Sequence, residues 1–206
     1  MGAKFNGKII GSHSDYVCFS FQAIKHLTTG DGGALTCKTE QEYERIKKLR
    51  WFGLNRKYNG PKWEQDVTES VFKYHMNNIN AVIGIESMKN IDEIIGKHIK
   101  NGKYYDLKIN NPNIKKIRRS ENIESSYWIY TVLTEDREKF KKYMLDNGVE
   151  ADVVHIRNDK YSVFNKYKIN NLPGCDYFCS KMINIPVGWW LTEKEIEYIV
   201  NLINAY

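Results

Sequence analysis

Several protein classes are made improbable by what this chain of 206 residues lacks. Its four cysteines include no Cys-x-x-Cys pair, and Cys175 and Cys179 have no histidine at zinc-ligand spacing, so neither a disulfide framework nor a metal site is expected. Cys18 and Cys37 lie in apolar runs and are expected to be buried free thiols, which favours a cytoplasmic location. An 18-residue apolar run and a signal-peptide pattern are absent, so neither a membrane span nor secretion is expected.

The composition is that of a folded protein with a mild excess of positive charge. Hydrophobic residues make up 42% of the chain, enough for a sizeable core, and 31 Lys and Arg against 25 Asp and Glu give a net charge of +6. Apart from a cluster at residues 115–119, these charges are scattered. A basic surface attracts an anionic, phosphate-bearing substrate, whereas no groove-reading motif supports a nucleic-acid partner.

The most informative stretch is residues 18–36, which read CFSFQAIKHLTTGDGGALT. Two apolar runs flank a turn rich in threonine and glycine, a pattern that predicts a strand, a tight loop and a second strand. Lys25 lies on this loop. Partial desolvation there would lower the pKa of its ammonium group and free an amine to attack a carbonyl, and the hydroxyl of Ser20 could bind a phosphate. The alternative is a plain β-hairpin with an exposed lysine.

The segment FSFQAIKHLTTGDGGAL closely resembles the cofactor-lysine segment of the DegT/DnrJ/EryC1/StrS family, whose pattern is FSF-x-x-x-K-x-x-x-x-G-E/D-G-G. The members are sugar aminotransferases that use pyridoxal 5'-phosphate (PLP). The resemblance implies that Lys25 forms the Schiff base with PLP and that Ser20 binds the cofactor phosphate. Relatives that dehydrate their substrate carry histidine at this position, so lysine favours transamination.

The beginning of the chain, GAKFNGKIIGSHSDYVCFSF, resembles an internal part of the family's large domain. The resemblance therefore implies a chain that lacks the N-terminal part of that domain. The missing part would carry the aspartate that pairs with the pyridine nitrogen, a phosphate-binding turn and the side chain that stacks on the cofactor ring.

Two further segments suggest contacts with phosphate groups. RWFGLNR, which ends at Arg56, resembles the family's R-x-x-G-x-x-R segment, and a guanidinium can bind a nucleotide phosphate in bidentate fashion. FKYHMNNINAVIGIESM resembles a helix whose tip reaches the PLP phosphate of the neighbouring subunit, which places His75 at that contact. A surface arginine and a helix-end histidine without a ligand remain the alternatives.

Helical spacing predicts a helix over residues 39–51 with a capping box at Thr39. A long helix is expected to continue to about His98 and to break at Asn101–Gly102 or soon after. We place the domain boundary near Pro112, which gives a partial large PLP-binding domain at residues 1–112 and a small α/β domain at residues 113–206.

The small domain should contain three strands and two helices. Strands are expected from Tyr127, at residues 149–156 and at residues 182–185, and helices at residues 136–145 and after the capping residue Thr192. VHIRND occupies the place where many relatives have a His-Tyr element near the sugar. His155 and Arg157 are therefore candidate substrate-binding residues, and a capped turn with a salt bridge is the alternative.

The expected fold class is thus α/β: the C-terminal part of a fold type I, aspartate aminotransferase-like transferase. The expected function is transamination of a nucleotide-linked keto-deoxyhexose, with glutamate as donor, in polysaccharide biosynthesis, by a truncated or split chain. Its partners would be the nucleotide sugar, the amino donor, and a second copy or a missing N-terminal half, with no nucleic acid, membrane or metal. The alternative is an inactive remnant that acts as an interaction or regulatory module.

Overall fold

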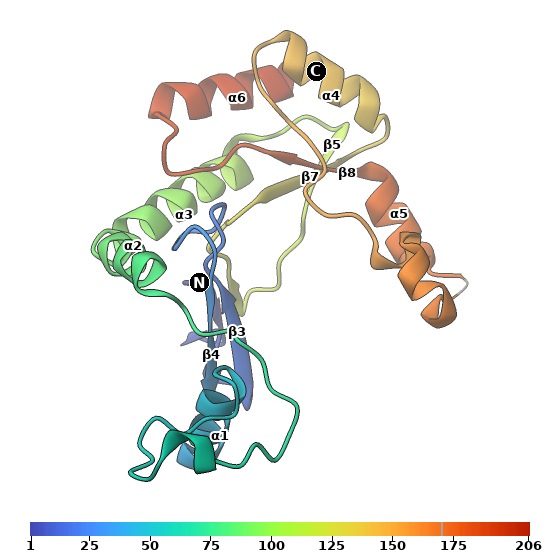
Figure 1. Ribbon diagram of the computed structural model, residues 1–206. Helices are drawn as coiled ribbons and strands as arrows, with labels where there is room; N and C mark the ends of the chain where they lie inside the picture. Colours follow the sequence, from blue (N-terminus) through green and yellow to red (C-terminus); the bar gives the residue numbers. More distant parts are fainter. Residues whose placement is uncertain (170) are drawn as a thin grey trace. The chain divides into compact units, whose positions relative to one another are not determined.

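The computed structural model describes residues 1–169 and 171–206, which form two compact units, Met1–Ile91 and Asp92–Tyr206 (Figure 1). In the described residues, no helix combines the length and the apolar character that crossing a membrane requires.

Unit 1 is built around a two-stranded antiparallel sheet. Residues Tyr16–Ser20 (β3) pair with residues Gly33–Cys37 (β4), with Phe19 opposite Ala34 and Ser20 opposite Gly33. The predicted strand, loop and strand are therefore confirmed. The other elements of unit 1 are β1 (Lys4–Phe5), β2 (Lys8–Ile9), α1 (Glu40–Leu49), η1 (Lys62–Glu64) and α2 (Asn78–Met88).

Side chains at the N-terminal ends fix where the two α-helices of unit 1 begin. Thr39 accepts a hydrogen bond from the Glu42 backbone N–H, and the Glu42 carboxylate accepts one from the Thr39 N–H, as the predicted capping box requires. Asn77 caps α2 by accepting a hydrogen bond from the Asn80 N–H. α1 contains no buried residue, so unit 1 leaves much of its apolar surface exposed.

The expected burial of the thiols of Cys18 and Cys37 is wrong. The thiols are free, but Cys18 is exposed and Cys37 is only half-buried. Both residues lie on the β3–β4 sheet, whose side chains are mostly accessible within this chain. An apolar run can form a strand without a second layer to cover it.

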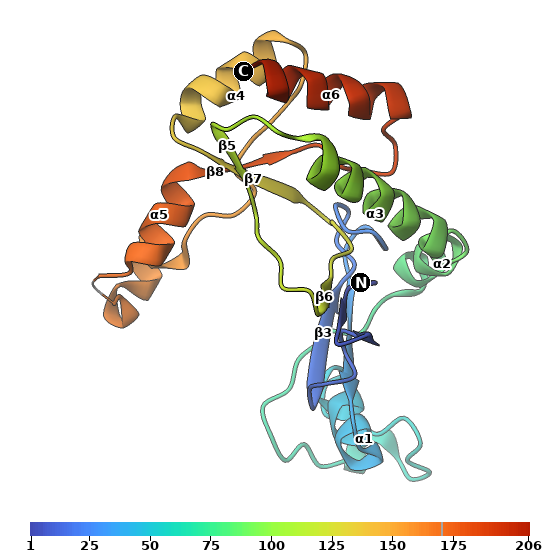
Figure 2. The same ribbon diagram turned by 180° about the vertical axis from the view of Figure 1, so that it is seen from behind.

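Unit 2 is a three-stranded antiparallel sheet with helices packed on it. The strand order is β5-β7-β8, with β7 in the centre. α4 and α6 lie together over one side of this sheet (Figures 1 and 2). The elements are α3 (Ile91–Lys108), β5 (Ile114–Lys116), β6 (Ile123–Glu124), β7 (Tyr130–Thr134), α4 (Arg137–Asp146), η2 (Asn158–Lys160), η3 (Ser162–Tyr167), α5 (Pro173–Lys181), β8 (Met182–Ile185) and α6 (Glu193–Ala205).

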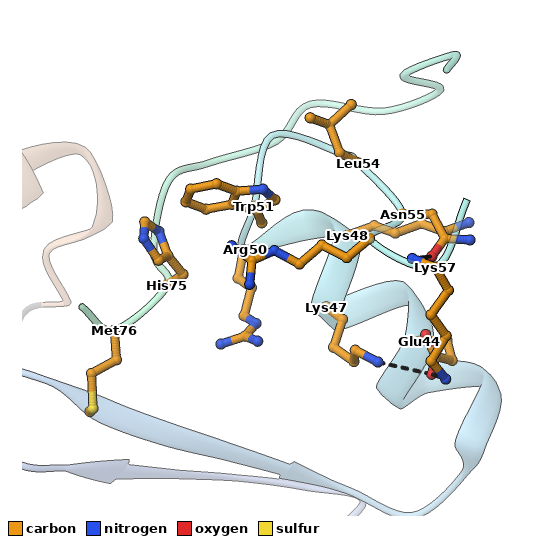
Figure 3. A pocket seen from close by; sticks show the side chains of 11 residues that line it. Glu44, Lys47, Lys48, Arg50, Trp51, Leu54, Asn55, Lys57, His75 and Met76 are labelled. Atoms are coloured by element: carbon orange, nitrogen blue, oxygen red, sulfur yellow. Dashed lines mark hydrogen bonds and ion pairs between the residues drawn. The ribbon is translucent and has the colours of Figure 1, made fainter. Parts of the chain in front are cut away.

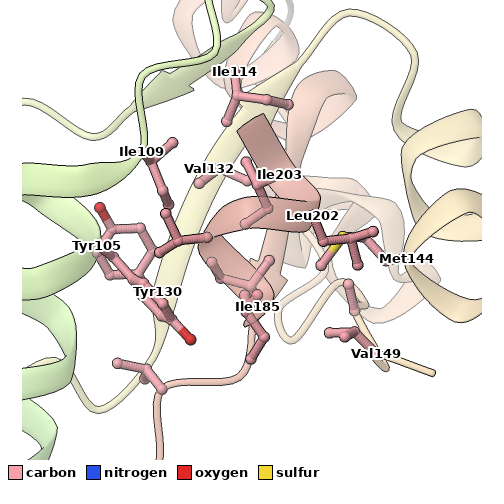
Figure 4. Close-up of a cluster of buried hydrophobic side chains, with 14 of the residues drawn as sticks. Tyr105, Ile109, Ile114, Tyr130, Val132, Met144, Val149, Ile185, Leu202 and Ile203 are labelled. Carbon is pink, nitrogen blue, oxygen red and sulfur yellow. The ribbon is translucent and has the colours of Figure 1, made fainter. Parts of the chain in front are cut away.

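The hydrophobic core belongs to unit 2, and side chains from α3, α4, α6 and the sheet interdigitate there (Figure 4). Fully buried members include Tyr105, Tyr130, Phe140 and Ile203. Full burial of one large side chain contributes roughly 1.5–3 kcal/mol. This core accounts for the predicted strand at β8, the helix at α4 and the Thr192 capping box of α6, which are all confirmed.

The helix break expected at Asn101–Gly102 is wrong. The chain breaks between α2 and α3, at residues 89–90, and α3 runs through both residues. Asn101 donates hydrogen bonds from Nδ2 to the carbonyls of Val187 and Gly188, at 3.2 and 3.0 Å. Gly102 lies against the ring of Tyr127. Asn and Gly in sequence usually mark the end of a helix, but here tertiary contacts keep Asn101 and Gly102 within α3.

The strand expected at residues 149–156 is also wrong. A single β-bridge joins Asp152 to Asn184, through backbone hydrogen bonds of 3.1 and 2.9 Å. The Asn184 side chain then accepts the N–H of Val154, at 3.0 Å, in place of a backbone carbonyl. A side-chain acceptor thus takes the place of a backbone acceptor, and the β-ladder ends after one bridge.

The division into packing units falls at Ile91–Asp92, ahead of the domain boundary expected near Pro112. α3 belongs with unit 2 because Tyr105 is part of its core, and Ile99 and Tyr104 pack against that core. The boundary at residues 112–113 concerns the domains of the parent fold and stays a prediction.

The contact between Gly102 and Tyr127 supplies a test of α3 packing. A Cβ atom at Gly102 would lie 2.2 Å from the Tyr127 ring, so we expect Gly102→Ala to lower the free energy of unfolding by about 1–3 kcal/mol. Gly96, in the same helix, is exposed with open space around it, and Gly96→Ala should be neutral or stabilising by up to about 1 kcal/mol. Urea unfolding of both variants measures the difference; equal effects would contradict this packing.

His98 should make the stability of unit 2 depend on pH. Burial lowers its pKa below the ordinary value of 6.5, against the opposing effect of its hydrogen bond to the Tyr127 carbonyl. The folded state then binds fewer protons than the unfolded state, so stability is lost as pH falls below about 6.5. We expect His98→Asn to remove this contribution to the pH dependence of the free energy of unfolding, which is measured by urea unfolding between about pH 7.5 and about pH 5.5. An unchanged slope would show that His98 does not titrate in this way.

Candidate functional site

The loop that carries Lys25 is fixed by hydrogen bonds to one carbonyl. The backbone N–H of Thr29 donates to the Phe21 carbonyl at 2.9 Å, and the Thr28 hydroxyl donates to the same oxygen at 3.2 Å. The Lys25 N–H donates to the Gln22 carbonyl at 2.9 Å, which closes a turn at the lysine itself. The loop between β3 and β4 is therefore ordered by its own threonines.

Gly32 allows the loop to approach its neighbours closely. It has a φ of +156°, and a Cβ atom there would lie 2.4 Å from Thr29 Oγ1 and 2.9 Å from Met76 Cε. The side chain of Asn80, in the first turn of α2, donates to the Asp31 carbonyl at 2.6 Å. The glycine-rich turn is thus packed on both the loop and α2.

The chemical environment of Lys25 fits a reactive amine. Its side chain is half-buried, and this burial lowers the pKa of its ammonium group. The Met1 ammonium lies close enough that repulsion between the two charges lowers the pKa of Met1, after the larger effect of its own burial. The exposed Ser20 ends β3, and its Oγ accepts a weak hydrogen bond of 3.4 Å from the Gln22 N–H. The Ser20 hydroxyl is available to donate to an anion.

A second group of predicted residues meets in a basic pocket of about 90 Å³ within unit 1 (Figure 3). Trp51 contacts both Arg56 and His75: the guanidinium is 4.7 Å from one ring centroid of Trp51, and the imidazole packs against the indole edge to face with centroids 3.9 Å apart. The pocket is lined by Glu44, Lys47, Lys48, Arg50, Trp51, Leu54, Asn55, Arg56, Lys57, His75 and Met76.

His75 has the electrostatics of a residue beside several cations. Burial is the largest cause of its lowered pKa, followed by the charges of Lys73, Arg56 and Arg50. Its Nδ1 is inaccessible to solvent and has no hydrogen-bond partner among the described residues. Bound phosphate would add negative charge and reverse the effect of the neighbouring cations.

The basic cluster at residues 115–119 does not line this pocket. Of residues 115–119, Lys116 donates to the Asp106 and Ile109 carbonyls, and Arg119 pairs with the Asp106 carboxylate at 3.0 Å, so these charges serve unit 2 structurally. The basic pocket instead comes from the last turn of α1 and the loop after it. The run KKLRWFGLNRK at residues 47–57 carried this signal.

The third group, His155 and Arg157, lines a largely apolar pocket of about 190 Å³ in unit 2, beside Thr131 and Asn184. The two latter side chains bond each other at 2.7 Å. His155 is exposed, and its ring packs against Trp128 with centroids 5.6 Å apart. Histidine and tryptophan here could contact a hydroxylated ring.

Arg157 is held by two carboxylates. It forms a bidentate pair with Asp159, at 2.8 and 2.6 Å, and bonds Asp176 on α5. These partners raise the pKa of the guanidinium, because both stabilise its charge. No residue of η2, η3 or α5 is buried, so little apolar packing holds the segment that contains them. The ion pairs of Arg157 are therefore a principal contact that holds this segment in place.

Comparison with known proteins relates these sites to a family. The family model described as the DegT/DnrJ/EryC1/StrS aminotransferase family matches residues 1–204. The GDP-perosamine synthase of Escherichia coli O157:H7 is 26% identical over 210 residues, which cover all of this chain and 55% of the relative. The chain thus spans about half the length of the curated relatives it matches.

Solved structures agree with this assignment. AtS13 from Actinomadura melliaura has a TM-score of 0.93 and 37% identity, over 100% of this chain and 55% of AtS13. The sugar aminotransferase CalS13 from Micromonospora echinospora has a TM-score of 0.93 and 32% identity, over 99% of this chain and 55% of its own. A Streptococcus pneumoniae structure in the PLP form shares the fold, with a TM-score of 0.86 at 22% identity.

The expected fold class is confirmed: an α/β chain that corresponds to part of the fold type I transferases. Aminotransferases of this family use PLP, so the predicted cofactor is also confirmed at the level of the family. The family match includes the Lys25 loop, the basic pocket, and His155 and Arg157 of the apolar pocket. The chain therefore belongs to the DegT/DnrJ/EryC1/StrS aminotransferase family.

Proposed function

We propose that this chain takes part in PLP-dependent transfer of an amino group to the keto group of a nucleotide-linked deoxyhexose. The amino donor would be an amino acid, glutamate, and the product would enter polysaccharide biosynthesis in the cytoplasm. The observation that carries the proposal is the ordered loop with a half-buried Lys25 whose pKa is lowered.

The residues present fit the cofactor. Lys25 supplies the amine for covalent attachment, and the Ser20 hydroxyl, at the end of the adjoining strand, can donate to a phosphate oxygen. The close packing of Gly32 against Thr29 and Met76 keeps side chains out of the turn. PLP, when bound, supplies the electron sink for amino transfer.

Lys25 has two tasks in this proposal. It would hold the cofactor through Nζ, and its amine would move a proton at the substrate carbon. Its lowered pKa serves both tasks, because a neutral amine is required for attack and for accepting a proton. Thr28 and Thr29 keep the lysine in place by fixing the loop to the Phe21 carbonyl.

The basic pocket is the proposed phosphate-binding part of the site. Arg56 would bind a nucleotide phosphate, and His75 would bind the PLP phosphate of a second copy of the chain. Arg50 and Arg56 form no ion pair with a carboxylate in the part of the chain that the structure describes, so both can bind an anion. Trp51 contacts both Arg56 and His75.

In unit 2, His155 and Arg157 are the proposed sugar-side residues. His155 is exposed beside Trp128 and can bond a hydroxyl. The charge of Arg157 is matched by Asp159 and Asp176, so its contribution would be to hold the segment that carries His155.

The proposed partners are a second copy of the chain and a polypeptide that supplies the part of the family fold not matched here. A catalytically inactive interaction or regulatory module is the second candidate function. The observation that favours it is the apolar surface that unit 1 leaves exposed, for example around α1, which contains no buried residue.

Trapping the cofactor on Lys25 tests the proposed function. The chain is incubated with PLP, reduced with borohydride and digested, and peptide mass analysis locates the phosphopyridoxyl adduct. We expect a specific adduct on Lys25, because its amine is more often neutral than that of a fully solvated lysine.

Lys25→Ala should lose the adduct, whereas Lys103→Ala, at an exposed position of α3, should retain it. An absent adduct, or adducts spread over surface lysines, would show that this chain alone forms no PLP site and would favour the inactive module.

The role of Arg157 is tested by hydrogen exchange. Arg157→Lys keeps the charge but loses the bidentate geometry, so we expect backbone amides of η3 and α5 to exchange roughly several-fold faster. Arg118→Lys, at an exposed position without an ion pair among the described residues, is the control. Exchange that stays at the wild-type rate would mean that other contacts hold this segment.

A further inference from the structure

The chain contains four Asn-Gly pairs, at residues 6–7, 59–60, 101–102 and 147–148. Such a pair can modify itself, because glycine has no Cβ to obstruct the approach of its backbone nitrogen to Cγ of the asparagine. When the nitrogen attacks Cγ, ammonia leaves and a succinimide forms, which water opens to aspartate or isoaspartate. The net change converts one amide and one water into one carboxylate and one ammonium ion. Since the four pairs share this chemistry, differences among them come from the fold.

Hydrogen bonds oppose the attack at two of the pairs. Asn101 is 9% exposed and lies within α3, and its side-chain nitrogen donates to two backbone carbonyls, at 3.2 and 3.0 Å. The side chain of Asn147 donates to the Tyr143 carbonyl at 2.8 Å, and the Gly148 N–H donates to the Leu145 carbonyl at 2.9 Å. These bonds must break before the nitrogen can reach Cγ.

The pair at residues 6–7 is exposed, but a tight turn holds it. Phe5 of β1 stands opposite Lys8 of β2, so Asn6 and Gly7 are the two residues of the hairpin turn. Their φ values are +49° and +73°, as a type I′ turn requires. In this turn the first residue has a ψ of about +30°, which holds the next nitrogen away from its Cβ. The paired strands therefore keep the reacting atoms apart.

None of these restraints applies to Asn59 and Gly60. The two residues lie in the loop between α1 and η1, outside any helix or strand, and Asn59 is exposed. In the part of the chain that the structure describes, neither the Asn59 side chain nor the Gly60 N–H has a hydrogen-bond partner. The φ of Gly60 is also outside the left-handed region that the turn at residues 6–7 requires.

We propose that Asn59 is a self-modification site, at which deamidation through the Gly60 nitrogen adds a carboxylate beside the basic pocket. Lys57, which lines this pocket, precedes Asn59 by two residues (Figure 3). Two residues of chain span at most about 7 Å, which is less than the Debye length of about 8 Å at physiological ionic strength. The added charge therefore acts on the pocket and weakens the binding of phosphate. This effect rests on the proposed function of the pocket, whereas the deamidation does not.

The rates of deamidation in the folded chain test the site. The full chain is incubated at mildly alkaline pH, and peptide mass analysis follows the deamidated fraction at all four pairs. We expect residue 59 to react about ten-fold or more faster than residues 6 and 147, and about a hundred-fold or more faster than residue 101, because only the latter three are restrained. In urea, where the restraints are lost, the four rates should agree within about three-fold.

Asn59→Gln is the variant that isolates the site. Glutamine would have to close a larger ring, so the modification at residue 59 should be lost while the other three rates stay unchanged. A variant of Gly60 is less suitable, because a Cβ atom there would lie 2.4 Å from the Tyr58 hydroxyl. Two results would overturn the modification site: a rate at residue 59 no higher than at residue 147, or one that rises in urea as much as that of residue 101.

Asn59→Asp tests the effect on the pocket, because it supplies the added charge without the chemistry. Inorganic phosphate is titrated at low ionic strength, and the imidazole NMR signals of His75 report binding. We expect the Kd for phosphate to rise about two- to five-fold, and the difference to vanish at about 1 M salt. Asn90→Asp, at an exposed position of unit 1 that does not line the pocket, is the matched control and should bind as the wild type does.

The modification site and the proposed function can fail separately. A Kd that is unchanged in Asn59→Asp would overturn the effect of the carboxylate on the pocket. A wild-type chain that binds no phosphate would contradict the proposed pocket itself, and the four deamidation rates would still decide the modification site.

Discussion

The Phe21 carbonyl is the acceptor on which the candidate cofactor site depends. The Thr29 N–H and the Thr28 hydroxyl both donate to it, at 2.9 and 3.2 Å, and so close the loop between β3 and β4 around Lys25. The turn that follows is tied to α2 through the bond from Asn80 to the Asp31 carbonyl. A lysine on a loop fixed at both ends can be half-buried, and burial is the cause of its lowered pKa.

The two units differ in how they are stabilised. Unit 2 has a closed core in which three helices and a sheet bury aromatic and aliphatic side chains, and even its polar groups are paired, as with Asp106, which accepts from Tyr130 and Arg119. Unit 1 has local order, through the capping box of α1, the Asn77 cap of α2 and turn hydrogen bonds, but α1 has no buried residue. A large, mainly apolar cavity between α1 and β4 is the consequence.

Arginine residues have two roles in this protein, and the sequence alone does not distinguish them. Arg119 and Arg157 are each paired with carboxylates and stabilise packing in unit 2. Arg50 and Arg56 line a pocket with few carboxylates, around Trp51 and His75. An arginine already bound by two carboxylates has little free energy to gain from a phosphate, whereas one packed on an indole ring keeps its donors available.

The sequence by itself determined the elements whose signals are local. The β3–β4 hairpin follows from two apolar runs around a Thr- and Gly-rich turn, and the helices after Thr39 and Thr192 follow from capping boxes. The motif around Lys25 identified the family and its cofactor, because those residues stand next to one another in the chain. Local hydrogen bonds and short spacing suffice for such features.

The tertiary structure decided what depends on distant residues. α3 continues through Gly102 because the Tyr127 ring lies against it, and the strand expected near Asp152 stops after one bridge because the Asn184 side chain competes for the Val154 N–H. The basic pocket joins His75 to Arg56 through Trp51, and the exposure of Cys18 reflects a sheet that the described residues do not fully cover. Long-range contacts determine which of the locally possible structures forms. These contacts cannot be inferred from the spacing of residues along the chain.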